Sequence, residues 1–315
     1  MNEPARPIMR LSTTRSELLK KRVDPFTRVL AAVEQGNVRA LHRARVASRR
    51  LRELLPMLQL EPSRARKLSR RLRRVTMRLG AVRELDVLLL LIDELHVSRR
   101  ARSAGLSRVG IAVAKSRDEA RKRLATKLPI ADMVRLGRRL NRLVGELRAT
   151  ETSGSKTAAR SWRWAVDARV TARASRLAEA IQEAGAVYLP ERLHAVRIAL
   201  KKLRYAVELL AELGAGVTPA ELRALKRGQD LLGHMHDLQV LMTSVRKVQA
   251  SLMPPNLTIW RDLDALLVSL EDDCRHLHAH YMRSRDALTT VADRLSARPQ
   301  HQTAAVRTQA TRRAG

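Results

Sequence analysis

The sequence predicts an all-α protein built from two similar halves. Apolar residues recur at three- and four-residue spacing through most of the chain, whereas the alternation of β-branched residues that is typical of strands is absent. Glycine and proline fall mainly between the periodic stretches. A helical motif near residue 42 also recurs 152 residues further along the chain. We therefore expect two helical bundles related by a pseudo-two-fold axis.

Periodic stretches between breaks predict twelve helices, six in each half. The first half is expected to hold helices at 13–35, 38–60, 64–80, 82–100, 107–127 and 131–149. The second half is expected to hold helices at 159–185, 190–213, 219–232, 235–252, 257–282 and 284–297. The best-marked start is Thr218-Pro219-Ala220-Glu221, where an N-cap threonine, a proline at the first helical position and a glutamate can form a capping box.

One polar segment of small residues, at 150–158, has the composition of a linker. It divides a single domain at 13–297 into repeat halves at 13–149 and 159–297. Residues 1–12 and 298–315 show no periodicity, so we expect a disordered N-terminus and a disordered basic tail.

The charge of the chain is strongly positive. Of 315 residues, 62 are Lys or Arg and 31 are Asp or Glu, which gives a formal charge of +31 at pH 7. Such a charge repels itself unless polyanions or counterions neutralise it. Arginine supplies 51 of the basic residues, and its planar guanidinium can hold two phosphate oxygens at once. A GC-rich genome would also favour arginine over lysine, but it does not explain the net charge. The composition therefore indicates a polyanionic partner, such as nucleic acid, an anionic membrane or polyphosphate.

Cysteine content and hydropathy narrow the class further. A single cysteine, Cys274, excludes a fold stapled by intramolecular disulfides and favours a reducing compartment. No run of about 18 uncharged apolar residues occurs, and the N-terminal residues lack the apolar core of a signal peptide. We expect a soluble cytoplasmic protein that does not insert into membranes.

The repeated motif places a row of cations on each of two helices. Residues 41–58 read LHRARVASRRLRELLPML, and residues 193–210 read LHAVRIALKKLRYAVELL. On a helix, four cationic or histidine positions of each copy fall within about 80° of one another, opposite the apolar face. These stripes are His42, Arg45, Arg49 and Arg52, and His194, Arg197, Lys201 and Arg204, with Arg50 and Lys202 beside them.

Such a row is unfavourable without an anion, because like charges three or four residues apart repel. The alternative is a solvated face neutralised by nearby carboxylates. Glu53 is the only carboxylate between residues 42 and 58, and the stripe occurs twice, so an anion-binding surface is favoured.

A second motif follows each stripe. RLGAVRELDVLL at 78–89 matches LLGHMHDLQVLM at 231–242, and Glu84 aligns with Asp237. The preceding helix adds Arg66 and a cationic face with Arg70, Arg73 and Arg74, and the second copy offers Lys226 and Arg227 at the matching positions. If the two stripes face each other, a continuous basic groove or channel results.

At these two motifs the sequence resembles the CHAD family, the conserved histidine α-helical domain, over most of residues 13–297. The resemblance implies two helical bundles about a pseudo-two-fold axis, a central basic surface that binds inorganic polyphosphate and, in some members, association with polyphosphate granules (phosins). It carries the family's basic and histidine positions onto His42, Arg45, Arg49, Arg52, His194, Arg197, Lys201 and Arg204. Glu84 stands where the family more often has Asp, and we interpret this acid as structural.

Catalytic and metal sites are not expected. The Glu-x-Glu-x-Lys signature of triphosphatase domains fused to some CHAD domains is missing, and Ile111 follows Gly105 and Gly110 where a phosphate-binding loop needs Lys. The carboxylates are too dispersed to hold Mg²⁺ for phosphoryl transfer. His276 and His280 share a helix face, but two ligands make a weak metal site. We therefore predict a non-enzymatic binding protein without a cofactor or a metal.

Two alternatives remain. The charge would also suit a nucleoid protein that binds nucleic acid through the same surface, although seven aromatic residues are few for stacking on bases, and we expect nonspecific contact with DNA at low salt. A protein that lies on a membrane surface would need Trp or Phe on its apolar faces. His42 and His194 should gain a proton beside phosphate, which predicts stronger binding below about pH 6.5. The sequence leaves the oligomeric state and the preferred chain length open.

Overall fold

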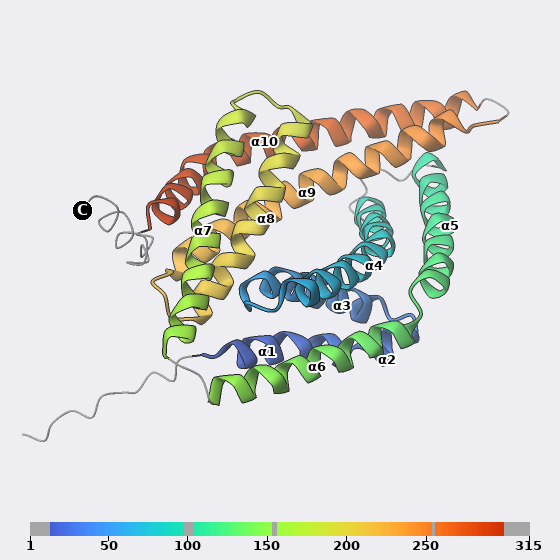
Figure 1. The fold of residues 1–315 in the computed structure, drawn as a ribbon. Helices are drawn as coiled ribbons and strands as arrows, with labels where there is room; N and C mark the ends of the chain where they lie inside the picture. The colour runs from blue at the N-terminus through green and yellow to red at the C-terminus, as the bar shows by residue number, and fades with distance from the viewer. Residues whose placement is uncertain (1–12, 98–103, 153–155, 254–255, 299–315) are drawn as a thin grey trace, which may run out of the picture.

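The computed structural model describes residues 13–97, 104–152, 156–253 and 256–298, and these ranges contain helices and no strand (Figure 1). The all-α prediction is therefore confirmed. The first half holds α1 (Arg15–Arg28), α2 (Leu30–Glu34), α3 (Val38–Leu54), α4 (Pro62–Val97), α5 (Ala104–Lys127) and α6 (Ile130–Thr152). The second half holds α7 (Lys156–Ala184), α8 (Pro190–Glu212), α9 (Pro219–Ala250) and α10 (Leu257–Ser296).

Each half packs its helices in the same cyclic order. In the second half α7 packs on α8, α8 on α9, α9 on α10, and α10 on α7. In the first half α1 packs on α3, α3 on α4, α4 on α5, and α6 on α1. The single helix α10 thus takes the place of α5 and α6 together. The first half has a break there because Pro129, directly before α6, disfavours a helical conformation in the residue that precedes it.

The two halves meet through the repeated elements of α3, α4, α8 and α9 and through α5, which contacts α10 and α9. Helix α3 contacts α8, its counterpart in the repeat, and α4 contacts α9. The pseudo-two-fold axis that relates the repeats therefore passes between the members of each pair. This arrangement brings the two copies of each motif to the same place in the molecule.

Three predicted helix breaks do not occur. The stretches predicted at 64–80 and 82–100 form the single helix α4, those at 219–232 and 235–252 form α9, and those at 257–282 and 284–297 form α10. Glycine in a helix costs only about 1 kcal/mol relative to alanine, so Gly80 and Gly233 do not end helices that bury long apolar faces. Proline has a stronger effect: α3 ends at Leu54, and Pro56 lies in a short 3₁₀ turn instead of continuing the helix predicted to residue 60.

The predicted linker at 150–158 is mostly helical, which corrects the sequence analysis. Helix α6 extends to Thr152 and α7 begins at Lys156, so only residues 153–155, which lie outside the described ranges, separate them. Glu151 explains why α6 continues, because its carboxylate accepts hydrogen bonds from the Ser16 hydroxyl at 2.6 Å and from the Arg15 backbone N–H at 2.9 Å. The segments 1–12 and 299–315, predicted to be disordered, also lie outside the described residues, whereas Arg298 donates to Asp167 at 3.2 Å.

The core is aliphatic, as the composition predicts. Leucine, valine and alanine line the inner faces of both bundles, and the large aromatic side chains in the core are Phe26, Trp162 and Tyr281. Burial of these faces holds the helices in place, while the cationic stripes of α3 and α8 lie on the sides that the bundles turn toward each other.

Candidate anion-binding site

Six cations gather where α3 meets α8, and we call them the central cluster. Arg45, Arg49 and Arg52 lower the pKa of Lys201 by repulsion across the helices, which places the two stripes face to face. Arg197 and Arg204 lower the pKa of Arg45 and of Arg49, respectively. The stripe prediction therefore corresponds to a real juxtaposition of the two repeats. The central cluster consists of Arg45, Arg49 and Arg52 from α3 and Arg197, Lys201 and Arg204 from α8.

Burial and mutual repulsion disfavour the charged forms of the cluster. Burial is the main cause that lowers the pKa of Arg45 to about 10, and the pKa values of Arg49 and Arg197 are lowered in the same way. Lys201 is affected most: burial, followed by repulsion from Arg49, Arg197, Arg45 and Arg52, lowers its pKa to about 7. About half of the Lys201 amines are then uncharged near neutral pH.

Two cluster donors have no acceptor among the described residues. Nε of Arg45 and Nη2 of Arg49 are buried and make no hydrogen bond within the parts of the chain that the structure describes. A buried donor without a partner costs about 1 to 3 kcal/mol, and more when it is charged. Both groups lie in the cluster, so an anion bound there would satisfy them.

Carboxylates close to the cluster are already engaged or lie at its edge. Glu53, the one acid in the first stripe, forms ion pairs with Arg173 and Arg169 of α7 instead of a stripe arginine. Glu208 pairs with Arg204 and, at 3.5 Å, with Arg50. A solvated face would need carboxylates that neutralise both stripes. The acids here neutralise only some of the stripe cations, mainly those of the second repeat.

Glu84 and Asp237 lie near the cluster and near each other. Both carboxylates raise the pKa of Arg197, while burial raises the pKa of Asp237. They come from the matching positions of α4 and α9, which meet at the pseudo-two-fold axis. This placement agrees with a structural role in balancing a stripe arginine.

Tyr205 is the one aromatic side chain that contacts the cluster among the described residues. The guanidinium of Arg49 lies 5.2 Å from the centre of its ring, and that of Arg204 lies 5.0 Å from it. Both distances are within the range of cation–π attraction. Sequence reasoning missed this role, although Tyr205 directly follows a stripe arginine and stands at the repeat position of Glu53, which also holds two arginines.

The environment of the stripe histidines disfavours their charged forms in the free protein. Burial and nearby cations lower the pKa of His42 and of His194 below the usual 6.5. His236, whose ring centre lies 4.8 Å from that of His194, has a pKa lowered to about 4 by burial, Arg197, His194 and Lys201. Arg83 occupies the matching position beside His42. Sequence reasoning favoured His236 as a hydrogen-bonding or phosphate-facing group and did not single out Arg83, although alignment of the second motif places the two at matching positions.

An arginine-lined hollow adjoins the cluster on α3 and α4. Its volume is about 860 Å³, and its lining consists of Arg52, Arg66, Ser69, Arg70 and Arg73. The structure thus brings the predicted Arg70 and Arg73 together with the stripe residue Arg52. Arg74 is exposed and is not part of this lining.

The corresponding cations of the second repeat are placed differently. Lys226 forms an ion pair with Asp230 at 2.6 Å, and Arg227 is exposed on the same helix. Lys202 is also exposed, and its backbone carbonyl accepts a hydrogen bond from Arg173 at 2.7 Å. None of these three belongs to the central cluster.

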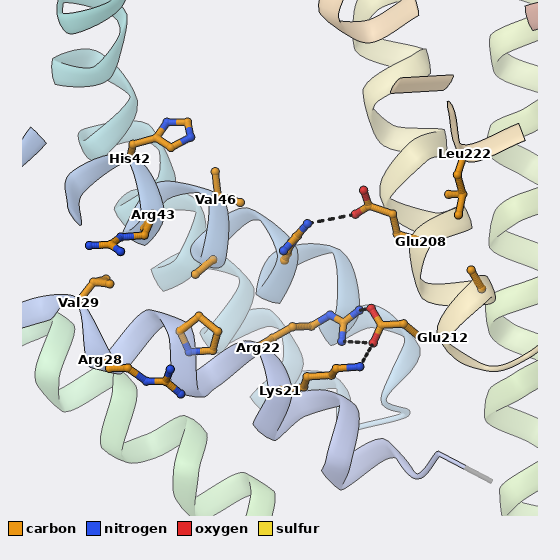
Figure 2. A pocket seen from close by; sticks show the side chains of 14 residues that line it. Lys21, Arg22, Arg28, Val29, His42, Arg43, Val46, Glu208, Glu212 and Leu222 are labelled. Carbon is orange, nitrogen blue, oxygen red and sulfur yellow. Dashed lines mark hydrogen bonds and ion pairs between the residues drawn. The ribbon is translucent and has the colours of Figure 1, made fainter. Parts of the chain in front are cut away.

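A second cleft, of about 880 Å³, lies between α1, α3 and the C-terminal end of α8 (Figure 2). His42, Arg43 and Arg28 line one side of it, as Figure 2 shows. On the other side Glu212 pairs with Arg22 at 2.8 Å and with Lys21 at 3.3 Å, so this cleft holds both signs of charge.

The histidines near residue 278 do not assemble into a metal site. His276 and His280 are exposed, whereas His278 packs against Tyr188 with ring centres 5.4 Å apart. Over the described ranges, no group of three or more potential metal ligands comes together. The same ranges include no helix that is long and apolar enough to cross a membrane.

A duplicated all-α fold with the cations of both repeats gathered at its axis defines the class of protein. The family model described as CHAD domain matches residues 17–246, which is more than half of the chain, so the chain belongs to the CHAD domain family. The resemblance identified from the motifs is thereby confirmed.

One solved structure supports the fold. The chain is similar to PptA from Streptomyces chartreusis, with 17% identity, a TM-score of 0.56, and 89% of this chain and 97% of that chain covered. It is also similar to the CHAD domain from the plant Ricinus communis, with 21% identity, a TM-score of 0.49, and 90% and 91% of the two chains covered. No curated protein matches the sequence.

Proposed function

We propose that this protein binds inorganic polyphosphate through the central cluster and does not catalyse its chemistry. The observation that carries the proposal is the convergence of six cations from two repeats, with buried N–H groups of Arg45 and Arg49 that lack acceptors. A polyanion satisfies those donors and removes the repulsion at the same time. Membership in the CHAD family directs the choice among polyanions to polyphosphate.

Binding in this proposal is electrostatic and indifferent to the ends of the polymer. Each arginine takes one or two phosphate oxygens, and counterions are released from the polymer as phosphates enter the cluster. Affinity increases with chain length until the basic surface is filled. Tyr205 supports this binding because its ring contacts the guanidiniums of both Arg49 and Arg204.

A non-enzymatic role follows from the carboxylates. Phosphoryl transfer normally needs Mg²⁺ held by clustered acids. In the described residues the acids nearest the cluster are Glu53 and Glu208, which form ion pairs with arginines, and Glu84 and Asp237, which face Arg197. We further propose that the protein acts in the cytoplasm on the surface of polyphosphate granules, where many phosphate chains are available at once.

The proposal is tested by removing four cluster cations together. We expect the variant with Arg45, Arg49, Arg197 and Lys201 replaced by Ala to lose at least about a hundredfold in affinity for long-chain polyphosphate, because several charge-assisted hydrogen bonds disappear. Its helices should remain folded by circular dichroism, since the apolar faces are untouched.

A matched control removes the same amount of charge elsewhere. Arg108, Arg138, Arg139 and Arg148 are exposed on α5 and α6. Their replacement by Ala should change the affinity by no more than about threefold, because exposed charges are largely screened. Equal losses in both quadruple variants would show that net charge, and not the cluster, accounts for binding.

A further inference from the structure

The hollow on α3 and α4 is an almost purely cationic surface. Arg66 lies three and four residues before Ser69 and Arg70, and Arg73 lies three and four residues after Arg70 and Ser69, so all four share one face of α4. The side chains of Arg66, Arg70 and Arg73 make no ion pair or hydrogen bond with any described residue. The acid that acts on Arg66 is Glu61, whose carboxylate accepts from the Ser63 hydroxyl at 2.5 Å and from the Arg64 N–H at 2.9 Å. An anion bound on this face would therefore relieve the repulsion between its arginines.

Among the described residues, the matching positions of α9 carry fewer unpaired cations than this hollow. Pro219 and Leu222 stand at the positions of Arg66 and Ser69. Lys226, at the position of Arg73, pairs with Asp230 at 2.6 Å. Of the three α4 arginines in the hollow, only Arg70 has a cationic counterpart that forms no ion pair with a described residue, Arg223.

Arg52 is the stripe residue that borders the hollow, and its counterpart in the second repeat is neutralised. Arg204, the counterpart of Arg52, pairs with Glu208 and donates to the side chain of Gln229 at 2.8 Å. Leu222, Glu208 and Glu212 instead line the cleft of mixed charge shown in Figure 2. The pseudo-two-fold symmetry of the fold is thus broken in its charges.

Arg52 connects the hollow to the central cluster. It lines the hollow, and it also lies close enough to Lys201 and Arg49 to act on their ionisation. A phosphate chain held by Arg49 and Lys201 therefore meets Arg52 next and the α4 arginines after it. On the second-repeat side the same chain would meet Arg204, already paired, and the carboxylates beyond it.

We propose that a polyphosphate chain leaves the central cluster in one direction, through a second anion site formed by Arg52, Arg66, Arg70 and Arg73. This inference rests on the proposed function, because it assumes that the cluster holds the polymer. The four guanidiniums engage about four further phosphates if each takes one. Short chains then use the cluster alone, whereas long chains gain the second site on one side of the molecule.

The pseudo-symmetry supplies the test and its control. One variant carries Arg70→Ala and Arg73→Ala, and the control carries the repeat-equivalent pair Arg223→Ala and Lys226→Ala, which removes the same charge from exposed helix positions. Affinities for long-chain polyphosphate and for tripolyphosphate are measured by fluorescence titration on the full chain at about 150 mM salt, where distant charges are screened.

We expect the Arg70 and Arg73 variant to lose at least about fivefold in affinity for the long chain, and the dependence of log affinity on log salt to fall by about 1 to 2 as two phosphate contacts are lost. The control pair should change the long-chain affinity by less than about twofold, and both variants should bind tripolyphosphate as the wild type does. Equal losses for the long chain in the two variants, or no loss in the Arg70 and Arg73 variant, would overturn the one-sided path.

Failure of the proposed function is distinguishable from failure of this inference. The proposed function would be wrong if the wild-type protein bound neither long-chain polyphosphate nor tripolyphosphate. It would also be wrong if an Arg49→Ala, Lys201→Ala variant bound tripolyphosphate with wild-type affinity. If only the one-sided path is wrong, the wild-type protein still binds both polymers, and the Arg49→Ala, Lys201→Ala variant still binds tripolyphosphate more weakly.

Discussion

Lys201 is the residue at which burial and like charge act most strongly. Its pKa of about 7 in the free protein compares with an ordinary value of 10.5, and every charged neighbour that affects it is an arginine. A phosphate placed beside the amine favours the charged form, so the bound protein has a higher Lys201 pKa than the free protein. Binding is therefore linked to protonation of this residue.

The sign of this linkage gives a pH prediction. Because the pKa of Lys201 is about 7 when free and higher when bound, affinity should be greatest at and below neutral pH and should fall as pH rises through the interval between the two values. At about pH 8 the protein should take up a proton on binding, which calorimetry in buffers of different ionisation enthalpy measures. Lys201→Met should remove this uptake. A wild type that binds at that pH without proton uptake would contradict the assigned environment of Lys201.

The histidine contribution lies lower on the pH scale than the sequence suggests. An ordinary histidine beside phosphate would strengthen binding below about pH 6.5. In the free protein burial and arginines lower the pKa of both His42 and His194, so their protonation on binding needs a lower pH.

Tyr205 gives a second prediction at the scale of the residue. We expect Tyr205→Ala to weaken polyphosphate binding by about fivefold, since a cation–π contact is worth about 1 kcal/mol and the ring holds two guanidiniums. Tyr205→Phe retains the aromatic face and should bind as the wild type does. Equal weakening in the two variants would show that the hydroxyl, and not the ring, is what matters.

At the scale of the element, Gly80 and Gly233 occupy the same repeat position but have different surroundings. A Cβ on Gly80 would lie 3.3 Å from Nε of Arg45, whereas nothing lies within 4 Å of a Cβ on Gly233. Gly80 therefore leaves room in α4 for a cluster arginine. Sequence reasoning treated both glycines as helix breaks, because the reason for the first one lies on a different helix.

This pair of glycines provides a matched prediction. Gly233→Ala should raise the free energy of unfolding by about 0.5 to 1 kcal/mol, because alanine is the better helix former, and should leave polyphosphate affinity unchanged. Gly80→Ala should gain less stability and should lower the affinity by about twofold to threefold, because Arg45 has to shift. Chemical denaturation and titration measure the two effects. Identical behaviour of the two variants would contradict the role given to Gly80.

At the scale of the whole molecule, the duplication and the two cationic stripes could be predicted from the sequence, because the motif recurs 152 residues along the chain and the stripes follow from helical periodicity. Which acid pairs with which cation could not be predicted in the same way. Glu53 lies within the first stripe, yet it pairs with Arg169 and Arg173 of α7, and Asp230 neutralises Lys226 although Arg73 has no such acid. The ion pairs of Glu53 join different helices and depend on packing that no local pattern specifies, whereas Lys226 and Asp230 lie four residues apart on one helix, a spacing that the sequence itself shows.

The most direct test of the central claim is a competition titration with the full-length wild-type protein. Labelled long-chain polyphosphate is bound at about 150 mM salt and is displaced by unlabelled polyphosphate or by duplex DNA at equal phosphate concentration. The buried, arginine-rich cluster at the junction of α3 and α8 suits a narrow flexible chain, so polyphosphate should compete at least about tenfold better than DNA. Equal or stronger competition by DNA would contradict this account and would instead indicate a general polyanion-binding or nucleoid protein.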